Sequence, residues 1–307
     1  MCCKLPITPR KSGDCSFFAP CLALFCSFAT MITEKEEMVK ETLPVKGTVF
    51  GNEEIRIQMD KEKQLFRANL FAEKLFAFDL DGTLTQHKTP LSAENRAVLE
   101  KLSKKAGLCM VGAGMCRRIF EQMGRFPIDI IGNYGMQVAV YNKEKRDLEL
   151  VEDIRKPVDR KSVEERVNRL RQKYGYTEYE GENVEYHASG CITFPLLGTK
   201  AKQESKLSFD PDRTKRRAIY EEVRDTFPEY TVFVGGSSSF DMAPRPYDKY
   251  YALDRYCRER GYAHDRVFFV GDDYGTGGND ESVYHSDFHF IQVDDYRKLP
   301  QIMEPFL

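Results

Sequence analysis

The segment Phe78-Asp79-Leu80-Asp81-Gly82-Thr83-Leu84-Thr85 follows directly on a short apolar run, Leu75-Phe76-Ala77-Phe78. The run predicts a buried parallel strand, and open α/β sheets build their binding sites at the carboxyl ends of such strands. A turn at Gly82 lets Asp79 and Asp81 face one ligand. Two carboxylates held that close are costly unless a cation separates them, and Mg2+ prefers oxygen ligands. The segment therefore predicts a magnesium site.

A second acidic segment follows the apolar run at 266–270, and it reads Gly271-Asp272-Asp273-Tyr274-Gly275-Thr276-Gly277-Gly278-Asn279-Asp280. Neighbouring parallel strands end at the same edge of a sheet, so we expect Asp272 to face Asp79. Lys249 opens the preceding helix, and a lysine there would neutralise charge on a transferring group. Taken singly, these features also suit a turn, a helix cap and a surface lysine. Their order along the chain favours a catalytic site.

The surrounding pattern predicts an α/β fold, in which strands alternate with helices joined by right-handed crossovers in a Rossmann-like parallel sheet. Strands are expected over 75–78, 107–111, 128–131, 136–141, 266–270 and 288–293, and helices over 92–105, 117–123 and 249–260. Between about 142 and 243 the order changes to helices at 158–174 and 214–226 with strands at 191–194, 230–234 and 238–242. This block predicts an inserted α+β domain.

The expected organisation therefore has five parts. They are a leader or upstream extension (1–30), a charged lead-in (31–70), the first part of the core (71–141), the inserted domain (142–243) and the second part of the core (244–307). The apolar run near the start resembles a secretory signal, but Pro20 interrupts it and Met31 opens a polar segment. We expect a cytoplasmic protein, with secretion as the alternative if 1–30 is a signal peptide.

Composition narrows the class of partner. The 307 residues carry a formal net charge of -2, so no global charge favours nucleic acid or an anionic membrane. The basic run from Arg213 to Arg217 is interpreted as a solvated helix face rather than a polyanion site. Of nine cysteines, five lie before residue 27, and no CxxC pair follows, which indicates a reducing compartment. The expected partner is therefore a small molecule rather than nucleic acid or a membrane.

These motifs resemble those of the haloacid dehalogenase superfamily, in the Cof-type branch whose cap is an inserted, sheet-containing α+β domain. Phe78 to Thr83 matches its first motif, Lys249 its third, and Gly271-Asp272 with Asn279-Asp280 its fourth. Within the superfamily, the segments 235–249 and 271–281 are most similar to eukaryotic-type phosphomannomutases. The resemblance covers about 75–300 and is weakest in the middle of the inserted domain.

The resemblance implies an aspartyl-phosphate mechanism with Mg2+ as cofactor. Asp79 would attack phosphorus, and Asp81 would protonate the leaving oxygen and later activate the acceptor. Thr83 and Gly112 would line the phosphate pocket, although the second motif here has glycine where the superfamily usually has Ser or Thr. The metal ligands implied are Asp79, the carbonyl oxygen of Asp81, Asp272 and, from the fourth motif, Asn279 and Asp280.

One departure decides the expected reaction. A hexose-phosphate mutase holds a phosphate at each end of its substrate with arginines on the cap, and neither 186–190 nor 195–200 contains one. Lys88 replaces an arginine in the core, and His187 and Lys200, with Lys202, are weaker substitutes. We therefore expect a sugar-phosphate phosphatase, with a phosphomannomutase-like mutase as the alternative. A catalytically silent protein is disfavoured because all four motif residues are present, and a homodimer through the cap is a further expectation.

Overall fold

A computed structural model describes residues 74–307. The expectations for 1–30 and 31–70 lie outside the described residues. Within 74–307, no helix combines the length and the apolarity needed to cross a membrane. The four cysteines of this part of the chain are free and buried.

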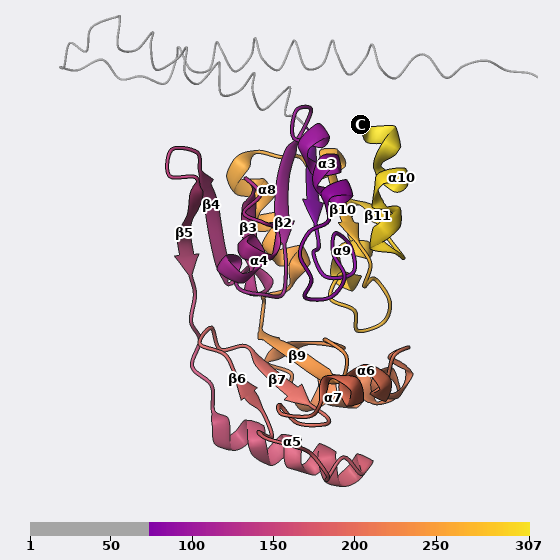
Figure 1. The fold of residues 1–307 in the computed structure, drawn as a ribbon. Coiled ribbons are helices and arrows are strands. Elements are labelled where there is room, and N and C mark those ends of the chain that lie inside the picture. Colours follow the sequence, from indigo (N-terminus) through magenta and orange to yellow (C-terminus); the bar gives the residue numbers. More distant parts are fainter. Residues whose placement is uncertain (1–73) are drawn as a thin grey trace, which may run out of the picture. The chain divides into compact units, whose positions relative to one another are not determined.

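A seven-stranded sheet forms the core, in the spatial order β11-β10-β1-β2-β3-β4-β5 (Figure 1). The strands are β1 (Leu75–Phe78), β2 (Gly107–Val111), β3 (Asp129–Gly132), β4 (Gln137–Asn142), β5 (Asp147–Asp153), β10 (Val267–Gly271) and β11 (His289–Gln292). The five strands from β11 to β3 pair in parallel, whereas β4 and β5 pair antiparallel. The predicted α/β fold with a parallel core sheet is confirmed.

Helices cover both faces of this sheet. They are α3 (Ala93–Leu102), α4 (Cys116–Gln122), α8 (Lys249–Arg260), α9 (Glu281–Tyr284) and α10 (Leu299–Met303), with short 3-10 turns η1 (Asn133–Gly135), η2 (His264–Arg266), η3 (Tyr296–Lys298) and η4 (Glu304–Phe306). Side chains of β1 alternate between the faces. Phe76 and Phe78 pack with α3, α4 and α10, while Leu75 and Ala77 pack with α8 and α9. This burial on both faces explains why the strand is uniformly apolar.

A second, four-stranded antiparallel sheet, in the order β6-β7-β9-β8, forms the inserted cap. Its elements are α5 (Arg160–Tyr174), β6 (Glu185–Tyr186), β7 (Ile192–Pro195), α6 (Gln203–Phe209), α7 (Thr214–Thr226), β8 (Tyr230–Phe233) and β9 (Ser239–Pro244). One face of the sheet packs against α5 and α7. Thr193 and Asp241, on the alternating positions of β7 and β9, line a cavity instead.

The expected start of the inserted domain at residue 142 is wrong, because β5 pairs with β4 and extends the core sheet to Asp153. Only Leu148 of β5 is buried, so the strand carries too weak an apolar pattern to be recognised in the sequence. The cap sheet therefore begins only after this hairpin.

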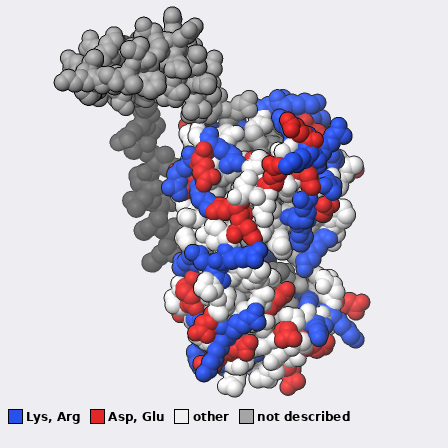
Figure 2. Space-filling model, turned by 90° about the vertical axis from the view of Figure 1, so that its left-hand side faces the viewer, with Lys and Arg blue, Asp and Glu red and all other residues white. Residues whose placement is uncertain are grey.

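The interpretation of the basic run as a solvated helix face is wrong for two of its members. Arg216 is 1% exposed and its Nε donates to Asp210 Oδ2 at 2.8 Å. Arg213, at the N-terminus of α7, is half-buried and pairs with Asp273 of the core. Elsewhere, basic and acidic side chains are interspersed over the face shown in Figure 2.

Candidate active site

Lys249 lies at the centre of the site and is fully buried. It is the first residue of α8, whose N-cap residue Asp248 accepts a hydrogen bond from the backbone N–H of Tyr251. Lys249 Nζ donates to Asp79 Oδ1 at 2.6 Å, to Asp280 Oδ1 at 2.7 Å and to Asn279 Oδ1 at 2.7 Å. One ammonium thus joins the ends of β1 and β10.

The charges of this group depend on one another. Burial acts to lower the pKa of Lys249, but Asp280 and Asp79 outweigh it, so the net pKa is raised and the lysine is cationic. Burial raises the pKa of Asp79 well above its usual range; Lys249 opposes this shift, and the carboxylates of Asp280 and Asp272 add to it. Asp79 is therefore a carboxylate whose ionised form needs positive charge.

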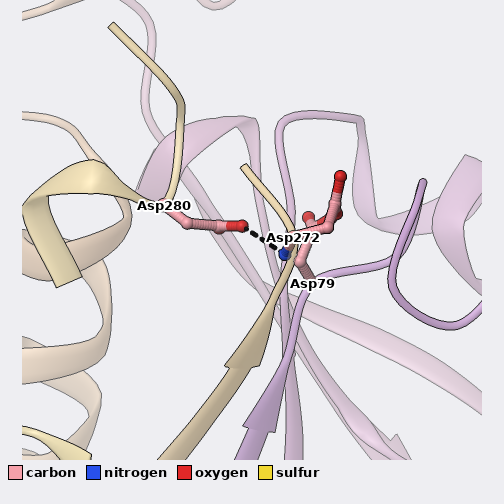
Figure 3. A group of neighbouring side chains, drawn as sticks. All are labelled: Asp79, Asp272 and Asp280. Carbon is pink, nitrogen blue, oxygen red and sulfur yellow. Dashed lines mark hydrogen bonds between the residues drawn. The ribbon is translucent and has the colours of Figure 1, made fainter. Parts of the chain in front are cut away.

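The loop after β10 is organised around Asp280. Its Oδ2 accepts a hydrogen bond from the backbone N–H of Asp272 at 3.1 Å (Figure 3). The same oxygen accepts a second hydrogen bond, from the backbone N–H of Asp273 at 3.0 Å. Thr83 Oγ1 donates to Asp272 Oδ1 at 2.8 Å. Gly82 has a φ of +107°, and a Cβ on it would lie 2.3 Å from Asp272 Oδ2, so a side chain there would displace Asp272. The two motif loops therefore fit together closely.

Oxygen atoms of Asp79, Asp272 and Asp280 lie within 4.8 Å of one another. This donor set fits Mg2+, a hard cation that prefers carboxylate oxygens. Burial, followed by the charge of Asp280, raises the pKa of Asp272 to about 6, so a cation beside it would be stabilising. Both oxygens of Asp280, and the side-chain oxygen of Asn279, accept hydrogen bonds from protein donors.

Asp81 is held in place from the side of the core. Its Oδ1 accepts hydrogen bonds from the backbone N–H of Lys88 at 2.8 Å and from Gln122 Nε2 at 2.7 Å. Arg118 Nη1 lies 3.6 Å from its Oδ2, and His87 Nδ1 lies 3.9 Å away. Unlike Asp79, Asp81 is partly exposed, so a ligand can reach its carboxylate.

A cavity of about 500 Å3 separates these core residues from the cap. The sequence-predicted residues that line it are Asp79, Asp81, Lys88, Gly112, His187, Asp272 and Asn279. Thr83, Lys249 and Asp280 are buried behind its wall. The structure does not bring Lys200 to the cavity; it is exposed, and Lys206 lines the cavity instead.

Sequence reasoning missed four cavity residues of chemical interest, namely Arg118, Tyr134, Arg213 and Asp241. Arg118 lies on α4, one turn before Gln122, and could have been found from the helix that follows the glycine-ended strand. Arg213 belongs to the basic run that was interpreted as a solvated helix face. Asp241 lies inside the segment 235–249 that leads to Lys249, and it carried no separate signal.

The sequence model of the eukaryotic phosphomannomutase family matches residues 95–294, more than half of the chain. The phosphomannomutase of Encephalitozoon cuniculi is 29% identical over 244 residues, which are 75% of this chain and 93% of that protein. The phosphomannomutase of Saccharomyces cerevisiae is 27% identical over 228 residues, covering 69% of this chain and 85% of that protein.

Solved structures with this fold are more distant in sequence. An N-terminally truncated IMP-nucleotidase of Plasmodium falciparum has a TM-score of 0.53 at 16% identity, covering 92% of this chain and 82% of that chain. A haloacid dehalogenase-like hydrolase of B. subtilis has a TM-score of 0.51 at 16% identity, covering 76% of this chain and all (100%) of that chain. These likenesses concern the fold. The chain belongs to the eukaryotic phosphomannomutase family.

Proposed function

We propose that this chain is a magnesium-dependent hexose-phosphate mutase of the phosphomannomutase type, which passes a phosphoryl group through Asp79. Phosphoryl transfer is supported by one observation above all. Asp79, Lys249 and Asp272 are grouped at the cavity between the core and the cap. Family membership supports a mutase over the hydrolase that the sequence motifs had favoured.

In this proposal Asp79 attacks the phosphorus of the substrate, and the bond between phosphorus and the leaving oxygen breaks. Asp81, fixed by Gln122 and the backbone of Lys88, gives its proton to the leaving oxygen and later takes one from the acceptor hydroxyl. Lys249 holds Asp79 in position and stabilises negative charge on the transferring group.

Bound Mg2+ would supply further positive charge to that group, held by Asp79, Asp272 and the carbonyl oxygen of Asp81. We assign Asp280 and Asn279 to positioning, because Lys249 and backbone N–H groups already use their oxygens. Asp280 then fixes the loop that carries Asp272.

A mutase must also hold the phosphate that is not transferred. The cavity has cations on both walls: Lys88 and Arg118 on the core, and Lys206 and Arg213 on the cap. Arg213 is the one cavity-lining arginine that the cap provides among the described residues, and its forked guanidinium suits a phosphate. It supports the mutase although 186–190 and 195–200 lack the arginines expected there.

Hydrolysis is the second candidate, and the same absence of arginine from 186–190 and 195–200 favours it. If the distal phosphate is held weakly, water can replace a sugar hydroxyl as the acceptor. The substrate would again be a hexose phosphate, captured by Asp79.

The two candidates are separated by following mannose 1-phosphate with purified protein, Mg2+ and a catalytic amount of a hexose 1,6-bisphosphate by phosphorus NMR. The mutase predicts mannose 6-phosphate appearing faster than inorganic phosphate, and a loss of rate when the bisphosphate is omitted. Steady release of inorganic phosphate without isomerisation would establish the hydrolase. If neither product forms with any of a panel of hexose phosphates, both candidates are wrong.

A further inference from the structure

Tyr134 carries a buried hydroxyl group that has no hydrogen-bond partner within residues 74–307. The residue lies in η1, is 3% exposed and belongs to the lining of the cavity. Its ring stacks on Phe233 of the cap, with ring centres 4.4 Å apart and planes inclined by 8°. Tyr134 therefore lies where the core meets the cap, and the stack fixes the direction of its hydroxyl.

The position is unfavourable in two respects. A buried hydroxyl without a partner loses the hydrogen bonds that it would make to water. The backbone of Tyr134 is also in the left-handed region, at φ 57° and ψ 27°, where an aromatic side chain is strained. Its backbone N–H is nevertheless bonded to Gly112 O at 3.2 Å, at the glycine-ended strand of the site. The chain holds this side chain at the cavity wall in spite of both costs.

The groups that act electrostatically on the hydroxyl all line the same cavity. After burial, which is the largest cause, the charges of Asp241, Cys191, Asp273 and Asp79 keep the pKa of Tyr134 well above its usual range. The phenol is thus a protonated donor at neutral pH. The negative charges of Asp241 on the cap and of Asp273 on the core act on it, so a phosphate dianion would be repelled there. A neutral hydroxyl group is the chemistry that suits this point.

We propose that Tyr134 is a substrate-binding residue whose hydroxyl donates a hydrogen bond to a ring hydroxyl of the sugar. This inference rests on the proposed function, since it takes a hexose phosphate as the ligand. Stacking against Phe233 keeps the ring in place in the free protein, so the hydroxyl is ready for the ligand before it arrives.

Tyr134→Phe tests the proposal, because it removes one oxygen and leaves the stack intact. We expect the KM for the best hexose phosphate, and its Kd by calorimetry with Mg2+, to rise about tenfold, the effect of one hydrogen bond. The melting temperature should stay the same or rise, since the variant no longer buries an unpaired hydroxyl. Unchanged KM and Kd would show that the Tyr134 hydroxyl makes no hydrogen bond to the sugar, and would overturn the proposal.

Tyr256→Phe is the matched control. Tyr256 is 6% exposed, lies outside the cavity lining and donates its hydroxyl to Asp129 Oδ2 at 3.0 Å. Removing that hydroxyl should lower the melting temperature and leave KM and Kd unchanged, which is the opposite pattern. An increase of KM and Kd in both variants would mean that any lost tyrosine hydroxyl disturbs the site, and would count against the proposal.

The part of the ligand that Tyr134 contacts is identified with inorganic phosphate and with monodeoxy analogues of the hexose phosphate. Inorganic phosphate should inhibit the wild type and Tyr134→Phe equally, because it lacks a ring hydroxyl. The deoxy analogue that lacks the hydroxyl contacted by Tyr134 should bind the wild type and Tyr134→Phe with the same Kd. Weaker inhibition of the variant by phosphate would place the contact on the phosphate and contradict the proposal.

Calorimetry and turnover together separate this inference from the proposed function. If hexose phosphates bind with a tenfold difference between wild type and variant but are not turned over, the function is wrong and the Tyr134 contact stands. If they are turned over with no difference, only the Tyr134 contact fails. If none binds, both fail.

Discussion

Lys249 Nζ, at the start of α8, lies 2.6 Å from Asp79 Oδ1, at the end of β1, although 170 residues separate the two in the sequence. The intervening chain includes the whole cap. Because the same ammonium also contacts Asp280 at 2.7 Å, it joins the two halves of the core at one buried point. The ion pair is therefore both a structural link and part of the candidate catalytic group.

Lys249→Met is expected to destabilise the protein and to reduce phosphoryl transfer. Removing one partner of a buried ion pair costs about 3–5 kcal/mol, because Asp79 and Asp280 are left without their cation. The free energy of unfolding in urea measures this. The double variant Lys249→Met/Asp280→Asn should lose less unfolding free energy than the two single variants lose in total. Strict additivity would show that the pair does not interact as described.

Asp81→Asn is expected to lower turnover by about 10²–10⁴-fold, because the leaving oxygen loses its proton donor. The turnover of an aryl phosphate should fall much less, because its leaving group needs no proton. Asp81 is partly exposed, so the melting temperature should change little. Equal losses for the sugar phosphate and the aryl phosphate would argue against an acid role for Asp81.

Mg2+ is expected to raise the melting temperature, because it binds the folded protein and neutralises three converging carboxylates. The shift should disappear in Asp272→Asn. Asp287→Asn, at an exposed carboxylate paired with His264, is the control and should retain it. The account of the metal site fails if Asp272→Asn shows the wild-type shift at every Mg2+ concentration.

Asp210 and Arg216 should stabilise the cap in a pH-dependent manner. Burial acts to raise the pKa of Asp210, but hydrogen bonds from Arg216 and from two backbone N–H groups outweigh it and lower the pKa below 3.8. The stabilisation is therefore complete above the unfolded pKa and is lost as pH falls through the folded one.

The difference in unfolding free energy between wild type and Asp210→Asn measures this contribution. It should be about 3–5 kcal/mol and constant from about pH 7 to pH 5, and it should shrink below about pH 4. A difference that varied between pH 7 and pH 5 would mean that another group is responsible.

The residues at the edge of the core sheet could be predicted because the local sequence specifies their position. Asp79 and Asp272 each follow an apolar run, and parallel strands bring such residues together whatever the length of chain between them. The boundaries of α7 and α8 were also predicted. For α8 the flanking residues follow helical rules, since Asp248 caps its start and Gly261 follows its end.

The cap residues of the site could not be predicted because tertiary packing decides them. Arg213 and Arg216 stand three residues apart in one basic run, yet one reaches the cavity and the other is buried beside Asp210. Tyr134 turns to the cavity through a left-handed backbone that no residue preference indicates. β5 joins the core through its pairing with β4 rather than through its own apolar pattern.

In the proposed reaction Asp79 accepts the phosphoryl group. The protein is mixed with Mg2+ and a hexose phosphate that it converts, and the reaction is quenched during turnover. The acyl phosphate is then reduced with borohydride, and the modified peptide is identified by mass spectrometry. We predict that the modification lies on Asp79, and that Asp79→Asn neither carries it nor turns over substrate. Turnover by Asp79→Asn, or a phosphoryl group trapped on another residue, would contradict the account.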